Sequence, residues 1–170
     1  KWKHGCGGCP QLGLYPKTLR DATAENYQKK QLLFTGIPNL TLYVPSRWLA
    51  GLVSQSFLKD YPLRVVPNTC DTTVFRPTGS DFRQKYALEG KFIVLGVANV
   101  WEPRKGLADF VRLAELLPSS CKIVLIGLSD RQIAQLPESI LGLPRTGSPR
   151  ELAQAYTAAD VYVCPSAEET

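Results

Sequence analysis

The sequence predicts an α/β protein whose core is a doubly wound, Rossmann-like parallel sheet. Continuous apolar runs at 91–98 and 122–127 show no alternation with polar residues, which is typical of strands buried on both faces. Between them, residues 105–117 place apolar side chains at helical spacing. Strands and helices that alternate in this way form βα units, with helices covering both faces of one parallel sheet. Ligands of such sheets bind beyond the carboxyl ends of the strands.

The first part of the chain is less regular. Residues 1–30 are rich in glycine, proline and charge and have little periodicity. β-Branched and aromatic residues predict short strands at 40–45 and 63–68. Between these strands, Ser46 is expected to cap a helix. Turn residues then dominate 67–79, which we interpret as a linker between two domains.

The regular pattern follows this linker. Ser80 is expected to begin a short helix. The segments "SDRQ" at 129–132 and "SPRE" at 148–151 fit the capping box, in which a serine at the N-cap and a Gln or Glu at N3 bond each other's backbone N–H groups. A last strand is predicted at 160–165.

The composition is that of an ordinary soluble globular protein, with 44% hydrophobic and 21% charged residues. No apolar run approaches the ~18–20 residues of a membrane-spanning helix, and no signal peptide is visible. The five cysteines are scattered, which indicates reduced thiols in a cytoplasmic protein. The chain begins without Met and stops just after a predicted strand, so we expect it to be a piece of a longer protein.

The formal net charge is +5, and the charge is unevenly placed. Much of it lies in residues 1–30, which hold six cationic and two acidic side chains. Such a basic face suits an anionic membrane surface or an acidic acceptor, or it is only solvated. Aromatic residues are not interleaved with the cations, so nucleic acid is not expected as a partner.

The stretch "VANVWEPRKGL", residues 97–107, places Arg104 and Lys105 where a helix begins. A helix N-terminus already carries partial positive charge, so adjacent cations are unfavourable there unless an anion such as a phosphate binds. A P-loop is excluded because Lys105 precedes Gly106 rather than following it. A dinucleotide fingerprint is excluded because Gly96 does not begin a G-x-G-x-x-G motif.

Four segments follow one another in a specific order: "PNTCDTTVFRP", "VLGVANVWEPRKG", "VLIG" and "RTGSPRELAQAYTAADVYVCPSAEE". Together they span much of residues 40–170, and this order resembles the retaining glycosyltransferases of family 4, of the bacterial polysaccharide-biosynthesis type, which have the GT-B fold. The resemblance implies a fragment truncated at both ends. Residues 1–66 would end an N-terminal acceptor-binding domain, 67–79 would be the interdomain linker, and 80–170 would begin a C-terminal Rossmann-like domain that binds the nucleotide-sugar donor.

The resemblance also implies which residues bind the donor. Lys105 matches the family's lysine that holds the diphosphate. Asn99 stands where the family has an arginine, and Arg104 is a plausible substitute because a guanidinium grips phosphate in bidentate fashion. Thr146 and Gly147 stand where the family's backbone brackets the nucleotide base.

Arg145 replaces a glycine that is usual in the family. Gly96 and Ala98, at the end of the strand before Asn99, are expected to face the nucleotide. Glu169 matches the first glutamate of the family's E-x7-E motif and is the expected catalytic residue, with Glu168 as an alternative one residue earlier.

The implied reaction moves a hexosyl group from a nucleotide-diphosphate donor to a glycan or lipid-linked acceptor, with retention of configuration. No Asp-x-Asp motif is present, so the cations are expected to stabilise the leaving diphosphate without a metal or other cofactor. The expected location is cytoplasmic or on the inner face of the membrane. The alternatives are a nucleotide-sugar epimerase or dehydrogenase, and a non-catalytic nucleotide-binding or zinc-binding module.

Weak candidates for a metal site lie near the start of the chain. Cys6 and Cys9 have the Cys-x2-Cys spacing of zinc ligands, and His4 is close in sequence. Structural zinc is held by four ligands, and these residues supply three at most. Zinc is therefore not expected, and a glycine-rich turn with two free thiols is the preferred interpretation.

Overall fold

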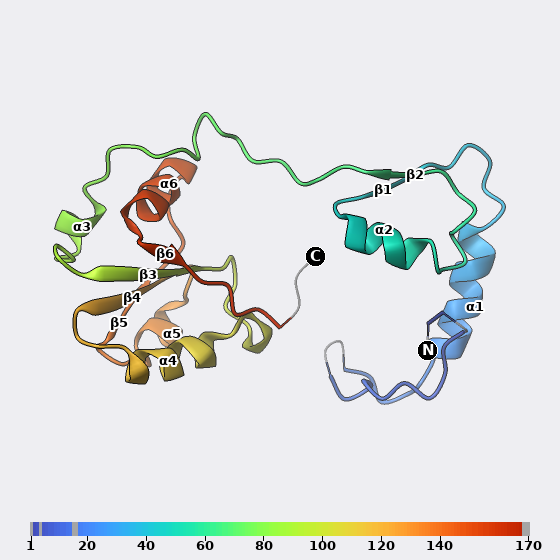
Figure 1. The fold of residues 1–170 in the computed structure, drawn as a ribbon. Helices are drawn as coiled ribbons and strands as arrows, with labels where there is room; N and C mark the ends of the chain where they lie inside the picture. Colours follow the sequence, from blue (N-terminus) through green and yellow to red (C-terminus); the bar gives the residue numbers. More distant parts are fainter. Residues whose placement is uncertain (1, 4, 15–16, 168–170) are drawn as a thin grey trace. The chain divides into compact units, whose positions relative to one another are not determined.

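The computed structural model describes residues 2–3, 5–14 and 17–167. The chain divides into two compact units between Thr69 and Cys70 (Figure 1). Within the described ranges, no helix is both long and apolar enough to cross a membrane.

The first unit contains a two-stranded parallel sheet and two helices. Its elements are α1 (Thr23–Phe34), β1 (Leu42–Val44), α2 (Arg47–Val53) and β2 (Leu63–Val65). The strands pair in register from Leu42↔Leu63, and α2 connects them. The predicted cap is confirmed, because the Ser46 hydroxyl accepts the Leu49 N–H at 3.1 Å. Helix α1 was not predicted; none of its residues is buried, so it leaves no strong apolar stripe in the sequence.

The second unit is the predicted doubly wound domain. Its sheet has the order β5-β4-β3-β6 with parallel pairing throughout. The elements are α3 (Phe82–Lys85), β3 (Phe92–Val97), the 3₁₀ turn η1 (Pro103–Lys105), α4 (Leu107–Leu116), β4 (Cys121–Ile126), α5 (Asp130–Ile133), β5 (Ile140–Leu143), α6 (Pro149–Ala158) and β6 (Val161–Tyr162).

Helices cover both faces of this sheet, as predicted (Figure 1). Alternate residues of β3 enter two separate cores, since successive side chains of a strand point to opposite faces. Ile93 and Leu95 pack with residues of α3 and α6, whereas Val94 packs with Phe110 of α4 on the other face. Phe110 is 1% exposed, and burying a side chain of this size stabilises the fold by about 1.5–3 kcal/mol.

The structure differs in places from the predicted elements. The helix predicted over 105–117 starts two residues later, because Gly106 is left-handed (φ 77°) and separates η1 from α4. The strand predicted at 160–165 is limited to Val161–Tyr162. The strand Ile140–Leu143 was not predicted, since its short apolar run contains a glycine and is followed by proline.

The two capping boxes differ in outcome. The box at Ser129 is confirmed in both directions. At Ser148 only half of the box forms: the Ser148 hydroxyl accepts the Glu151 N–H at 3.2 Å, but the Glu151 carboxylate accepts the N–H of Gly147, at 2.9 Å, instead of that of Ser148. This one-residue shift fixes the loop before α6, which matters for the site below.

Candidate functional site

A cavity of about 540 Å³ opens at the carboxyl ends of β3, β4 and β5. We call it the strand-end cavity. Its lining residues come from the linker, from the loops after these three strands and from the start of α6: Phe75, Val97, Ala98, Asn99, Ile126, Gly127, Arg145, Thr146, Gly147, Ser148, Pro149 and Leu152. The volume lies within the usual range of small-molecule sites, about 300–1,000 Å³.

The loop that carries Asn99 is held in place by Trp101. The indole Nε1–H of Trp101 donates to the carbonyl of Ile126 at 2.9 Å, and its ring meets Phe110 edge-to-face at 5.6 Å. The Gln132 amide donates in turn to the Trp101 carbonyl at 2.8 Å. Trp101 is 5% exposed, and its buried ring holds the loop after β3 against the sheet. Asn99, on the same loop, lines the cavity.

The floor of the cavity requires a glycine at position 127. Gly127 has φ 98°, and a Cβ built there would lie 1.8 Å from the carbonyl oxygen of Ala98. The Gly127 N–H donates to the carbonyl of Leu143 at 3.0 Å, and this bond joins the ends of β4 and β5. A side chain would both strain the backbone and push the loop after β3 away from the sheet.

The wall before α6 is electrostatically mixed. The carboxylate of Glu151 accepts the Gly147 N–H, and the Ser148 hydroxyl accepts the Glu151 N–H. These backbone donors are therefore already occupied, and a negative charge sits beside them. Such a helix start is poorly suited to a phosphate, although α6 is long enough to have a dipole.

Arg104 and Lys105 lie on the neighbouring turn η1, not on the cavity lining. The guanidinium of Arg104 pairs with Glu102 at 2.8 Å, and both side chains are about half exposed. The Arg104 carbonyl accepts the Ala167 N–H at 3.0 Å. The segment after β6 thus runs beside this turn.

The backbone conformation and the packing at position 106, directly after Lys105, require a glycine. Its φ is 77°, and a Cβ would lie 2.6 Å from Cγ of Pro165. Only glycine allows η1 to turn directly into α4 while Pro165 packs against the backbone. The glycine after Lys105 therefore allows the turn η1 to pack closely against the segment after β6.

The structure brings together four of the predicted donor residues in the strand-end cavity: Ala98, Asn99, Thr146 and Gly147. Gly96 lies instead in the core, where a Cβ would be 2.6 Å from Cζ of Phe110. Glu169, its alternative Glu168, and His4 lie outside the described residues.

Phe75 and Leu152 line the cavity but were not predicted. Their only signal in the sequence is apolar character. Phe75 belongs to the linker and reaches α6, where its ring meets Tyr156 edge-to-face at 6.5 Å. A contact across this separation in sequence depends on the tertiary fold.

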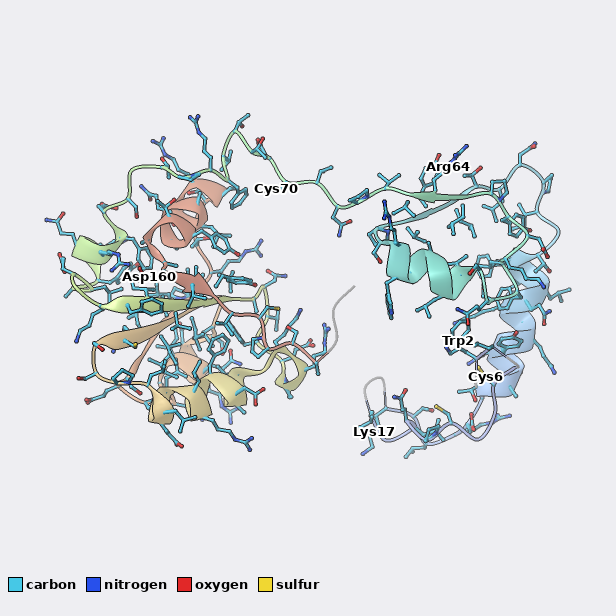
Figure 2. The ribbon with its side chains drawn as sticks, viewed as in Figure 1. Trp2, Cys6, Lys17, Arg64, Cys70 and Asp160 are labelled. Carbon is cyan, nitrogen blue, oxygen red and sulfur yellow. The ribbon has the colours of Figure 1, made fainter. Side chains whose placement is uncertain are left out.

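The two candidate cysteines near the start of the chain are half-buried free thiols. Cys6 lies beside Trp2 at a hollow against α1 (Figure 2). The Cys9 N–H donates to Asp21 at 3.0 Å. Hydrogen bonds from Thr23, and then from Cys9, lower the pKa of Asp21 from 3.8 to about 2. Among the described residues, no three His, Cys, Asp or Glu side chains form a group that could hold a metal.

No model of a known protein family matches the sequence. The chain is 34% identical, over 91 residues, to the α-galactosylglucosyldiacylglycerol synthase of Streptococcus pneumoniae (strain ATCC BAA-255 / R6). This match covers 48% of the chain and 24% of that protein, so the chain spans about a quarter of the length of this curated relative.

Solved structures resemble the chain over more of its length. Sucrose-phosphate synthase from Thermosynechococcus elongatus matches with a TM-score of 0.68 and 20% identity, covering 96% of this chain and 41% of that one. HepE from Anabaena, solved with UDP, matches with a TM-score of 0.59 and 19% identity, covering 74% and 38%. These neighbours are GT-B glycosyltransferases, and the chain has their α/β fold over less than half of their length.

Proposed function

We propose that the chain is part of a glycosyltransferase that binds a nucleotide-sugar donor at the strand-end cavity. The observation that carries this proposal is the convergence of three loops on one cavity at the carboxyl ends of β3, β4 and β5, beside a turn with two cations. In an open α/β sheet, this edge is where ligands bind. The binding of UDP and of UDP-glucose by HepE supports a nucleotide-sugar donor.

The acceptor in this proposal is a glycan or a lipid-linked molecule. The name of the pneumococcal relative, a synthase of a glycosylated diacylglycerol, favours a lipid. A lipid acceptor would bring the enzyme to the cytoplasmic face of a membrane, where the basic residues 1–30 meet anionic lipids. Polysaccharide biosynthesis is the corresponding role if the acceptor is a growing glycan.

The proposed chemistry is a metal-free hexosyl transfer with retention of configuration. The bond between the anomeric carbon and the diphosphate oxygen breaks, and negative charge grows on that oxygen. A hydroxyl oxygen of the acceptor bonds to the anomeric carbon on the same face, and its proton passes to the leaving diphosphate. Lys105 and Arg104, on the turn that leads into α4, stabilise this charge. The ion pair between Arg104 and Glu102 is about half exposed, and exposed pairs of this kind contribute little to stability, so exchanging Glu102 for a phosphate would cost little. Glu169 orients the sugar hydroxyls.

Calorimetry on the complete protein tests the proposal. UDP, GDP and ADP are titrated separately, together with NAD and Zn²⁺, and donor hydrolysis is screened with the matching nucleotide sugars. We expect at least one nucleoside diphosphate to bind and its sugar to be released slowly. Binding of NAD alone would indicate an epimerase or dehydrogenase, and binding of zinc alone would indicate a non-catalytic module.

A further inference from the structure

Arg145 has no role in the scheme above, yet it lies in the strand-end cavity. It is the one ionisable side chain among the described lining residues of this cavity. The residue is exposed, and within the described ranges its guanidinium has no hydrogen bond or ion pair to another residue. No described residue therefore occupies the five N–H donors of this guanidinium.

The order of the strands separates Arg145 from Lys105. Arg145 follows β5, at one edge of the sheet, and η1 with Lys105 lies beside the segment after β6, at the other edge. Neighbouring strands are about 4.8 Å apart, so the two edge strands are about 14 Å apart. A nucleoside diphosphate whose diphosphate lies at η1 consequently extends its base toward Arg145.

The charges at the cavity favour the same orientation. The Glu151 carboxylate accepts the N–H of Gly147, two residues after Arg145, and so it occupies a backbone donor that a phosphate would use. A diphosphate placed there would meet this negative charge. The neutral base is the part of the donor that fits this end of the cavity, between apolar walls such as Val97 and Leu152.

We propose that Arg145 determines base specificity by donating hydrogen bonds to a base whose edge presents carbonyl oxygens, uracil or guanine. This inference rests on the proposed function. A guanidinium has donors only, and it pairs well with an edge that offers two acceptors, such as O6 and N7 of guanine. The corresponding edge of adenine presents an amino group, which is itself a donor. Adenine would leave the guanidinium unsatisfied.

The test measures the dissociation constants of UDP, GDP and ADP for the complete protein and for two variants by calorimetry. Arg145→Ala removes the guanidinium. Arg150→Ala is the matched control, because it removes the same charge from an exposed arginine five residues away that does not line the cavity. Arg145 is exposed and has no partner within the described ranges, so its replacement leaves the fold intact, which thermal unfolding checks.

We expect the unmodified protein to prefer UDP or GDP over ADP by about five- to a hundredfold, the usual discrimination of a bidentate base contact. Arg145→Ala should abolish this preference by weakening the keto-base ligand, with ADP changed by less than about twofold. Arg150→Ala should keep the preference.

Two results overturn the inference while the proposed function stands. Equal weakening of all three ligands by Arg145→Ala would mean that the guanidinium contacts phosphate or stacks on any base, since stacking tolerates every base. An unchanged preference would mean that Arg145 is only a surface residue. If the unmodified protein binds none of the three diphosphates, the proposed function falls, and this inference with it.

Discussion

The side chain that the proposed chemistry depends on most, Lys105, owes its position to backbone constraints on both sides. Its N–H donates to the Glu102 carbonyl at 2.9 Å inside η1, and Gly106 then turns the chain against Pro165. Neighbouring Trp101 ties the same loop to β4. These backbone contacts keep Lys105 at the start of α4, although the helix dipole disfavours a positive charge at that end of a helix.

Lys105→Ala should therefore weaken the binding of a nucleoside diphosphate by about 1.5–3 kcal/mol, the worth of a hydrogen bond to a charged group. The nucleoside without phosphates should bind as before. Calorimetry with both ligands measures the difference. Arg112→Ala, which removes an exposed cation from α4, is the control. Equal losses for nucleotide and nucleoside would show that Lys105 supports the fold instead.

Glu169→Gln tests the assignment of the catalytic acid, which rests on the sequence motif. The substitution keeps the size of the side chain and removes its charge. A residue that stabilises positive charge at the anomeric carbon acts mainly in the transition state, so kcat should fall by about 10²-fold while the donor KM changes far less. Glu168→Gln should be nearly silent. The reverse pattern would shift the motif by one residue, and two silent variants would reject it.

At the scale of secondary-structure elements, Arg83 joins four of them at the amino-terminal end of the sheet. From α3, its guanidinium donates to the carbonyl of Ala158 in α6 at 3.0 Å and to that of Lys91, just before β3, at 2.7 Å. It also pairs at 2.7 Å with Asp160, just before β6. The Asp160 carboxylate accepts the Ile93 N–H of β3 at 2.7 Å. These contacts hold the amino-terminal end of the sheet together. The strand-end cavity lies at the opposite, carboxyl-terminal end.

Arg83→Ala should lower the free energy of unfolding by about 2 kcal/mol, because it leaves partly buried carbonyls without their donor. Thermal unfolding in the presence and absence of the bound nucleotide measures this loss. Arg83→Lys should recover only part of the stability, since an ammonium cannot reach three acceptors in the planar geometry of a guanidinium. Nucleotide affinity should be unchanged, and a large fall in affinity would contradict the separation of the two ends.

The stability that Asp160 and Arg83 contribute at this end of the sheet depends on pH. The Ile93 N–H, and then the Arg83 guanidinium, hold the pKa of Asp160 below its usual value of 3.8. Because the pKa is lower in the folded state, the carboxylate stabilises the protein above pH 4 and loses this effect as the pH falls through the folded pKa. The melting temperature should thus drop below pH 4, and Asp160→Asn should flatten this drop. An identical acid profile in the variant would assign the drop to other carboxyl groups.

The same elements show what the sequence could predict. Strands β3 and β4 are buried on both faces, so their apolar runs identify them directly, and the Ser46 and Ser129 caps depend on local bonds. Strand β5 was not predicted, because its four residues include a glycine. The membership of Phe75 in the cavity depends on a packing contact with α6, which no local pattern encodes.

At the scale of the whole molecule, the chain spans 41% of the length of sucrose-phosphate synthase and 24% of that of the pneumococcal synthase. The resemblance in sequence named a fold that the solved neighbours then confirmed. The residues predicted to bind the donor do not all lie at the strand-end cavity. Ala98 and Asn99 line it, whereas Gly96 lies in the core, where its missing Cβ makes room for Phe110.

The last prediction concerns how the complete enzyme neutralises the diphosphate. A metal-dependent transferase loses its activity when the metal is chelated, because the cation carries the charge of the leaving group. Here Lys105 and Arg104 are proposed to carry it, so EDTA should leave the rate of transfer within about twofold of its original value. Lys105→Ala should lower the rate with or without EDTA. Complete loss with EDTA, restored by Mg²⁺ or Mn²⁺, would refute the proposal. Partial loss together with a lower melting temperature would instead point to a structural metal, and Cys6→Ser and Cys9→Ser would then identify whether the two thiols hold it.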